Sequence, residues 1–250
     1  QSMEELLEVN MGATAVGTGL NADPLYIEKV VKHLAEITKL NIKSSPNLVD
    51  GTQNTDCYTT VSANLKICML NMSKISNDLR LMASGPRAGL GEINLPARQP
   101  GSSIMPGKVN PVIPEVVNQV CYKVIGNDLT VTFAAEAGQL QLNVMEPVLC
   151  HSIMESINFL GNALDTLREK CIVGITANKD ICLDMVKNSI GIVTALNPYI
   201  GYKNSTKIAQ EALQTGKSVY ELVIAHQLLT QEKLDEILDP RNMLTPHNTI

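Results

Sequence analysis

The sequence predicts an all-α protein in which the long central helices of a multi-helix bundle are followed by a small C-terminal helical domain. Three segments carry apolar residues at alternating spacings of four and three, a period that places one apolar stripe along a helix. Aromatic residues make up only 3% of the sequence and tryptophan is absent, so the core is aliphatic. An aliphatic core favours helices packed on helices over sheets, which depend on aromatic and β-branched residues.

The chain begins with a short helical pattern that runs into a glycine-rich stretch at residues 17–21. A complete protein seldom starts in this way, so we expect the chain to be a fragment. Residues 24–40 then predict a helix, because Pro24 suits the first helical turn.

The three periodic segments lie at residues 61–82, 113–131 and 153–171. Their stripes consist of Val61, Leu65, Cys68, Met72, Ile75, Leu79 and Met82; of Ile113, Val117, Val120, Val124, Asn127 and Val131; and of Ile153, Ile157, Leu160, Leu164, Leu167 and Cys171. Helices of roughly 25 to 30 residues reach ~40 Å. Further apolar residues flank the stripes, namely Met69, Leu81, Val116, Cys121 and Ile125. Each helix therefore has more than one apolar face, and we expect helices of other subunits to cover the second.

The helical pattern shortens after residue 173. Helices of roughly three turns are predicted at residues 178–187, 205–215, 218–227 and 230–238, separated by glycine and proline. Thr230 is in a position to cap the last of them. We therefore predict a partial central bundle domain at residues 1–173 and a small C-terminal helical domain at residues 174–250.

Composition argues against several classes of function. The net charge is −5 and no basic stripe is present, which argues against nucleic acid as a partner. No apolar run approaches ~18 residues, so we expect no membrane span. The six cysteines form no C-x-x-C pair and lie in apolar patterns, which indicates buried, reduced thiols and a cytoplasmic location. The four histidines have no ligand spacing, so no structural metal is expected.

The first two periodic segments are separated by a long irregular loop at residues 85–111. Six of the twelve prolines lie between Pro86 and Pro114. A connection of this length is either a linker or a binding loop. The hydroxyls of Ser102 and Ser103, the ammonium of Lys108 and the carboxamide of Asn110 favour an anionic, carboxylate-bearing ligand.

Glu115 follows this loop in the first turn of the second long helix. Glu115 is either a site residue or simply a carboxylate that stabilises a helix N-terminus. Local sequence alone favours the second interpretation.

The loop contains a motif that resembles a known family. The sequence GSSIMPGKVNP at residues 101–111 matches the signature G-S-S-x-M-P-x-K-x-N of the aspartase/fumarase superfamily. GTGLN at residues 17–21 and NDLRLMASGPRAGLGEINLP at residues 77–96 resemble sequences that flank this signature in the superfamily. NPVIPEVVNQVCYKVIGND and AAEAGQLQLNVMEP resemble the aspartate ammonia-lyase branch more than fumarase. The resemblance extends over essentially the whole chain.

The resemblance implies three helical domains and a homotetramer whose active sites draw on three subunits. This chain corresponds to the central helices and the third domain, and it lacks the N-terminal domain with two earlier motifs. It can therefore provide only one face of a site, and we expect little or no activity from it alone.

The resemblance also implies a reaction and assigns roles. The reaction is the elimination of ammonia from L-aspartate to give fumarate, with Ser102 as the general base. Ser103, Met105, Lys108 and Asn110 are expected to bind the substrate, Lys108 by pairing with a carboxylate and Ser103 by donating to the reacting one. Lys108 and Glu115 are counted with Ser102 among the catalytic residues, and Glu115 is expected to contact a pocket His or Gln of another subunit. Some relatives respond to divalent cations, but the sequence shows no ligand set, so no cofactor is expected.

Two alternatives remain open at the level of sequence. One is fumarate hydratase, a sibling lyase that the resemblance separates only by local stretches. The other is a non-catalytic helical assembly fragment, if nothing supplies the missing motifs.

Overall fold

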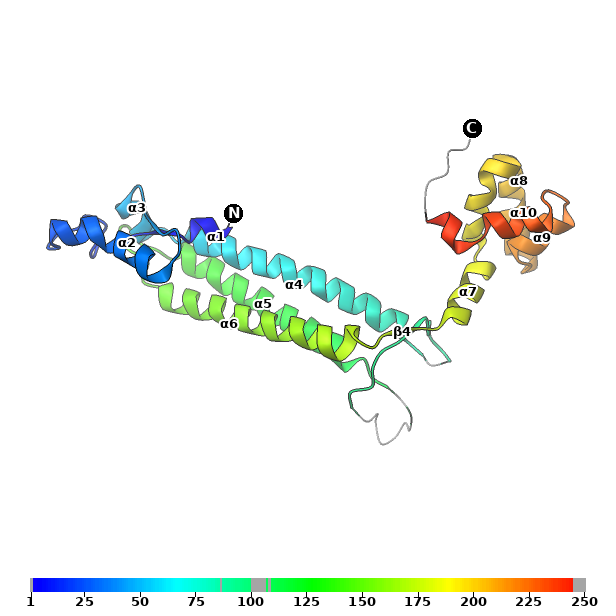
Figure 1. The fold of residues 1–250 in the computed structure, drawn as a ribbon, viewed down its shortest axis with the longest axis horizontal. Coiled ribbons are helices and arrows are strands. Elements are labelled where there is room, and N and C mark those ends of the chain that lie inside the picture. Colours follow the sequence, from blue (N-terminus) through cyan, green and yellow to red (C-terminus); the bar gives the residue numbers. More distant parts are fainter. Residues whose placement is uncertain (1, 86, 100–106, 108, 245–250) are drawn as a thin grey trace. The chain divides into compact units, whose positions relative to one another are not determined.

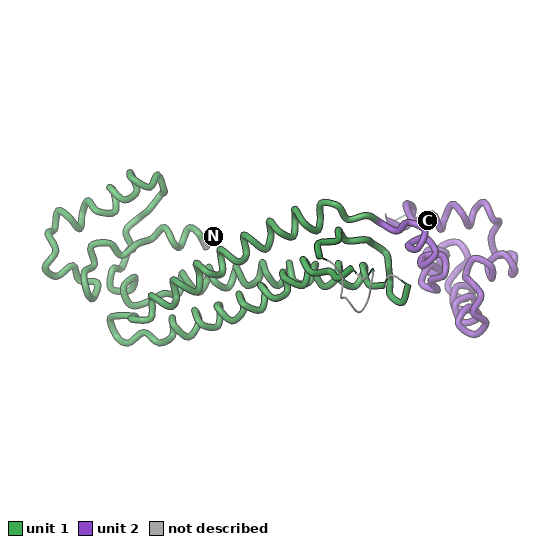
Figure 2. Tube along the Cα trace, turned by 90° about the horizontal axis from the view of Figure 1, so that it is seen from below, with its two compact units in different colours: residues 1–176 green, residues 177–250 purple. Residues whose placement is uncertain are grey.

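The computed structural model describes residues 2–85, 87–99, 107 and 109–244. The chain divides into two compact units, residues 1–176 and residues 177–250, which are coloured separately in Figure 2. The division falls three residues after the boundary that we expect from the sequence. Each unit has its own core and is described by itself.

Three long helices form the body of the first unit and lie side by side (Figure 1). They are α4 (Asp56–Met82), α5 (Val112–Glu136) and α6 (Glu146–Leu167), and α6 continues into a π-helical turn, η1 (Arg168–Ile172). Successive helices run in opposite directions, so the end of α4 and the start of α5 lie at the same end of the body (Figure 1). The three helices predicted from the heptad spacing are confirmed.

Helix α5 is the central helix because it packs against both α4 and α6. Its buried residues Val117, Val124 and Val131 all belong to the predicted stripe. On α4 and α6 the predicted stripes are only partly correct, since Ile75 and Ile157 remain 41% and 42% exposed. Several buried positions of these two helices are occupied by small residues instead, namely Ser62, Ser73, Ser76, Ser152, Ser156 and Ala163. Small side chains let helices approach closely, and this shifts the larger aliphatic residues to the edges of the contact.

Two polar residues of α5 connect the three helices. Asn127, the single polar member of the predicted stripe, donates to Ser156 Oγ (3.0 Å) and to Glu155 Oε2 (2.9 Å) of α6. Asp128 accepts from Ser62 Oγ at 2.9 Å on α4. These partners satisfy buried polar atoms that would otherwise destabilise the fold, and they fix the register of α5 against both neighbours.

The N-terminal part of the first unit consists of short elements. They are α1 (Ser2–Glu5), β1 (Glu8–Val9), α2 (Pro24–Thr38), β2 (Lys43–Ser44) and α3 (Leu48–Gln53). Strands β1 and β2 pair in parallel. Helix α2 starts at Pro24, as predicted, and the Asp23 side chain accepts from the Leu25 amide at 2.8 Å. Gly17 has a φ of +85°, and a Cβ there would lie 2.3 Å from the Val49 Cα, so only glycine fits.

The second unit packs short helices around one apolar cluster. The elements are α7 (Lys179–Asn188), η2 (Ile190–Ile192), α8 (Val193–Thr215), α9 (Val219–Ala225), α10 (Gln231–Ile237) and η3 (Pro240–Met243). Leu196, Ile208 and Leu234 are buried in the shared core. The Thr230 side chain accepts from the Lys233 amide at 3.3 Å, which confirms the predicted cap of α10.

One helical segment of this unit was not predicted from the sequence. Helix α8 begins at Val193, about three turns before the predicted start. Pro198 and Gly201 read as loop punctuation, yet Pro198 lies inside the helix and only Gly201 (φ 80°, ψ 157°) leaves the helical conformation. The break at Gly201 splits the segment into two helices, and burial of Leu196 and Ile200 stabilises the first.

The cysteines are only partly as predicted. All six are free, but only Cys121 and Cys171 are buried, and Cys150 is exposed. The prediction of buried thiols is therefore wrong for four positions. At two of them the adjacent residue is the buried one, since Met69 is buried beside Cys68 and Leu149 is buried beside Cys150. Within the described residues, no helix is long and apolar enough to cross a membrane.

Candidate functional site

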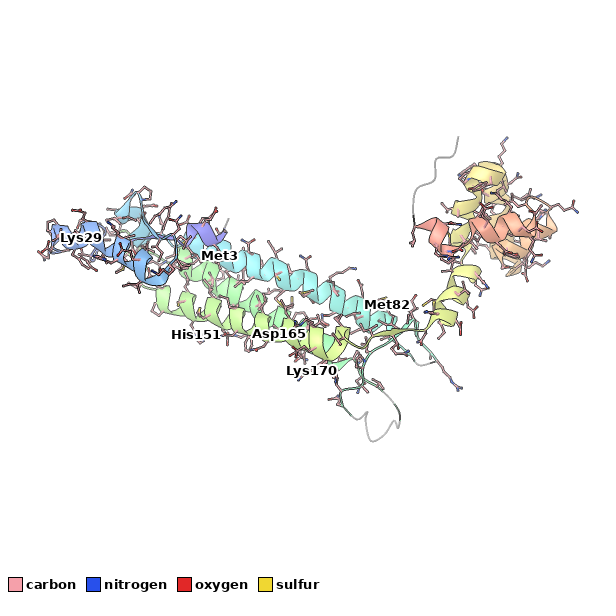
Figure 3. The ribbon with its side chains drawn as sticks, in the orientation of Figure 1. Met3, Lys29, Met82, His151, Asp165 and Lys170 are labelled. Carbon is pink, nitrogen blue, oxygen red and sulfur yellow. The ribbon has the colours of Figure 1, made fainter. Side chains whose placement is uncertain are left out.

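The predicted site residues divide into two groups. Ser102, Ser103, Met105 and Lys108 lie outside the described residues. Asn110 and Glu115 are described, and both lie where the loop enters α5. Met82, at the end of α4, and Lys170, in η1, are at this same end of the three-helix body, whereas His151 lies nearer the opposite end (Figure 3).

The sequence around Asn110 starts helix α5. The Val112 amide donates to the Asn110 carbonyl at 2.9 Å, and the Glu115 amide donates to the Pro111 carbonyl at 3.1 Å. Pro111 and Pro114 have no amide hydrogen to leave unpaired in the first turn, so they are compatible with a helix start. The consequence is a fixed backbone from Asn110 onwards, with the half-buried Glu115 carboxylate in the first turn.

Glu115 faces a guanidinium from the neighbouring helix. Arg80 Nη2 on α4 lies 4.0 Å from Glu115 Oε1. Arg80 Nη1 also donates to Asn118 Oδ1 at 3.0 Å. The buried Asn118 in turn donates through Nδ2 to Ser73 Oγ at 2.8 Å, so the chain of contacts ends in the interior. We call these four residues, Ser73, Arg80, Glu115 and Asn118, the α4–α5 polar chain.

Three members of this polar chain, Ser73, Arg80 and Asn118, were not predicted from the sequence. Ser73 and Arg80 are seven residues apart and therefore lie on one face of α4, while Glu115 and Asn118 are three apart on α5. Asn118 could have been noticed in the sequence, because it is a polar residue directly after Val117 of the predicted apolar stripe. No local signal pairs Arg80 with Asn118, since 38 residues separate them.

Two further polar atoms lie close to the polar chain along the helices. The Ser76 hydroxyl is buried and has no hydrogen-bond partner among the residues that the structure describes. Burial raises the pKa of the Cys121 thiol. The Ser73 side chain forms a hydrogen bond with this thiol, which lowers that pKa, but burial has the larger effect. Cys121 is therefore a neutral packing residue rather than a nucleophile.

The stretch between α4 and the motif is closed tightly against the end of α4. The Gly91 amide donates to the Ser84 carbonyl at 2.8 Å, and the Glu92 amide donates to the Met82 carbonyl at 2.9 Å. A Cβ on Gly89 would lie 2.4 Å from the Ser84 carbonyl carbon, so the turn requires glycine. After this turn the chain forms the short strand β3 (Ile93–Asn94) and proceeds to residue 99.

The described part of the site offers a carboxamide, a carboxylate and a guanidinium at one end of the helical body. Such groups orient and charge-match a polar ligand, but they do not by themselves hold a metal. Among the residues described, no group of three or more His, Cys, Asp or Glu side chains could hold a metal ion.

Two pockets lie elsewhere, one of about 520 Å³ between η2, α8, α10 and η3, and one of about 710 Å³ lined by residues near α1, β1, α3 and the start of α4.

Comparison with known families gives two matches. A family model described as Lyase matches residues 1–126, and one described as Fumarase C C-terminus matches residues 192–245.

Curated relatives carry a consistent name. The chain is 59% identical over 246 residues to aspartate ammonia-lyase of Bacillus subtilis, covering 98% of this chain and 52% of that protein. It is 57% identical over 240 residues to aspartate ammonia-lyase of Helicobacter pylori, covering 96% of this chain and 51% of that protein. The chain thus spans about half the length of the curated relatives it matches.

Solved structures share the fold. A fumarate lyase:delta crystallin from Brucella melitensis, bound to cobalt, matches with a TM-score of 0.92 and 49% identity, over 98% of this chain and 54% of that one. A class II fumarase from Schistosoma mansoni matches with a TM-score of 0.91 and 34% identity, over 99% of this chain and 55% of that one.

Proposed function

This chain belongs to the lyase family of the aspartase/fumarase superfamily, and we propose that it forms part of an aspartate ammonia-lyase, to which it contributes one face of a composite active site. The observation that carries the proposal is the motif of residues 101–111, whose last residues, Asn110 and Pro111, lead directly into α5, in a chain 59% identical to a relative named aspartate ammonia-lyase. The remaining part of the full-length protein would supply the rest of the pocket.

The chemistry requires removal of a proton from the carbon next to a carboxylate of L-aspartate. Ser102 acts as an alkoxide and takes this proton. The electron pair forms the carbon–carbon double bond as the carbon–nitrogen bond breaks, so ammonia leaves and fumarate remains. A free serine is a very weak acid, so backbone donors and nearby positive charge must stabilise the alkoxide.

The barrier depends on the substrate carboxylate, because proton removal places a second negative charge on it. Donors already in position stabilise that charge most effectively. Ser103 donates to the reacting carboxylate, Lys108 pairs with a carboxylate of the substrate, and Asn110 orients it, with Met105 alongside. Glu115 contacts the His or Gln that another subunit contributes, and the α4–α5 polar chain holds its carboxylate toward α4.

We further propose that the chain assembles as a homotetramer in the cytoplasm. Several large apolar side chains of the three long helices remain exposed in the single chain, among them Leu81 at 60% and Phe133 at 63%. Large apolar side chains left exposed along these helices favour a subunit interface. The six free cysteines are compatible with a reducing compartment.

Fumarate hydratase is the second candidate, because the C-terminal family match and one structural relative carry the name fumarase. One assay separates the two. The full-length protein is incubated with equal amounts of L-aspartate and L-malate, and ammonia and malate are measured. We expect release of ammonia in step with fumarate formation. Consumption of malate without ammonia would instead establish fumarate hydratase.

The third interpretation is a non-catalytic helical assembly fragment, and it applies to the chain of 250 residues taken alone. We expect little or no ammonia release from this chain, because two motifs of the pocket are outside it. Turnover by the isolated chain at a rate close to that of the full-length protein would contradict the composite site.

Replacement of Arg80 tests the polar chain in the full-length enzyme. Arg80→Gln removes the charge facing Glu115 while leaving an amide beside Asn118, so we expect kcat to fall about tenfold, a loss of about 1.4 kcal/mol of transition-state stabilisation. Lys74→Gln, which breaks only the exposed Lys74–Asp78 pair on the same helix, is the control and should keep wild-type kcat. Equal kcat values in both variants would show that Arg80 does not support Glu115.

A further inference from the structure

Residues 93–98 lead into the motif; they begin with strand β3 and are attached to the C-terminal end of α6. Ile93 and Leu95 pack against the apolar cluster of the three long helices. Asn94 Nδ2 donates to Thr176 Oγ1 at 3.2 Å. At the end of the segment, the exposed side chain of Arg98 reaches η1, the turn that contains Lys170.

The contact of Arg98 is made with backbone oxygens rather than with a carboxylate. Its Nε donates to the Lys170 carbonyl at 2.6 Å, and its Nη2 lies 3.5 Å from the Glu169 carbonyl. The last carbonyls of a helix lack partners within the helix, and the negative end of the helix dipole attracts a cation there. A planar guanidinium can reach two adjacent carbonyls at once, whereas an ammonium cannot match this geometry.

The local structure explains why these carbonyls face Arg98. Helix α6 ends in a π-helical turn, and π-turns reposition the carbonyls of a helix and are frequent at functional sites. Cys171 within this turn is buried; burial raises the pKa of its thiol, and the nearby Arg98 acts in the opposite direction. The guanidinium therefore lies over a turn whose other side is anchored in the core.

We propose that Arg98 is a positioning residue for the reaction: by clamping residues 93–98 to the carbonyls of η1, it fixes the place at which the chain enters the motif. This inference rests on the proposed function, since the motif supplies the reacting groups. Residues 93–96 are also held by apolar packing and by the Asn94 bond, so Arg98 is the last tether before residue 100 among the contacts of the described residues. Loss of that tether should affect the precision of the site more than the stability of the fold.

A matched control is available in the same turn. The Arg168 side chain is also exposed, at 64%, and within the part of the chain that the structure describes it is bonded only to the carboxylates of Asp165 and Glu169 on its own helix. Ion pairs of this kind contribute little. Arg168→Gln removes one positive charge from the same place without touching residues 93–98.

The test compares Arg98→Gln, Arg98→Lys and Arg168→Gln in the full-length enzyme. For Arg98→Gln we expect kcat for L-aspartate to fall by about tenfold or more, with KM changed by less than about threefold, because misplacement of catalytic groups affects the transition state most. Amide hydrogen exchange at residues 94–98 should become faster, while the melting temperature stays within about 2 °C of wild type. Arg98→Lys should restore part of both kcat and exchange protection, and Arg168→Gln should match wild type.

Each other outcome contradicts the proposal in a recognisable way. Wild-type exchange at residues 94–98 in Arg98→Gln would show that there is no clamp. Faster exchange with wild-type kcat would show that the clamp does not serve the reaction. A loss of kcat that Arg168→Gln shares would indicate a general charge effect. Failure of the proposed function itself would be visible earlier, as absence of ammonia release from the wild-type protein.

Discussion

Lys108→Ala in the full-length enzyme is expected to lower kcat/KM for L-aspartate by about 10³-fold. The ammonium is assigned to a substrate carboxylate, and its removal leaves the negative charge that develops in the transition state without its strongest partner. The helices should be unaffected, because the described helices α4 and α5 pack through residues outside the motif. Steady-state kinetics and far-UV circular dichroism of the same preparation make the measurement.

The control for this variant is Lys74→Ala. Lys74 is exposed on α4, and its ion-pair partner among the described residues is Asp78, one helical turn away, so its loss should leave kcat/KM unchanged. Survival of activity in Lys108→Ala, with Lys74→Ala also active, would remove Lys108 from the site. A loss of helical signal in Lys108→Ala would instead assign the residue a structural role.

Ser102→Ala is expected to cause the second large loss of activity. Removal of the proposed general base should lower kcat by about 10²- to 10⁴-fold, while KM changes by only a few fold, since the serine acts on the proton rather than on ground-state binding. Ser103→Ala is the matched comparison, because it removes the adjacent hydroxyl and one donor to the carboxylate. We expect Ser103→Ala to lower kcat less than Ser102→Ala does.

The order of these two effects identifies the base. If Ser103→Ala reduces kcat more than Ser102→Ala, the roles of the two serines are exchanged. If neither variant changes kcat, proton removal does not depend on the motif, and the assignment of a serine base is wrong.

The elements of the fold were largely predictable because their signals are local. Heptad spacing located α4, α5 and α6, and a proline at its first position located the start of α2. Thr230 marked the start of α10 through a side-chain bond to an amide three residues away. In each case the residues that determine the element lie within a few turns of one another.

The packing was harder to predict, since it depends on which residues meet. Periodicity of large aliphatic residues does not locate the buried serines, because burial of a serine depends on which helix lies against it. Ser62, for example, is covered by α5, where Asp128 accepts its hydrogen bond. Helix 193–200 was missed because Pro198 is unfavourable locally and burial of Leu196 compensates.

The same distinction applies to the site. The motif and Glu115 are adjacent in the sequence, so their association was predictable from one stretch. Arg80 reaches Asn118 across 38 residues, and Arg98 reaches Lys170 across 72. A single sequence carries no local signal for such pairs, so the residues that support the candidate site emerged only from the fold.

The most direct measurement is a crystal structure of the full-length protein with succinate, a dicarboxylate that lacks the amino group and cannot react. We expect succinate in a cleft between subunits, with the Lys108 ammonium and the Ser102 and Ser103 hydroxyls within hydrogen-bonding distance of it and its carboxylates. Succinate bound elsewhere, with these three side chains turned away from every cleft between subunits, would contradict the proposed function.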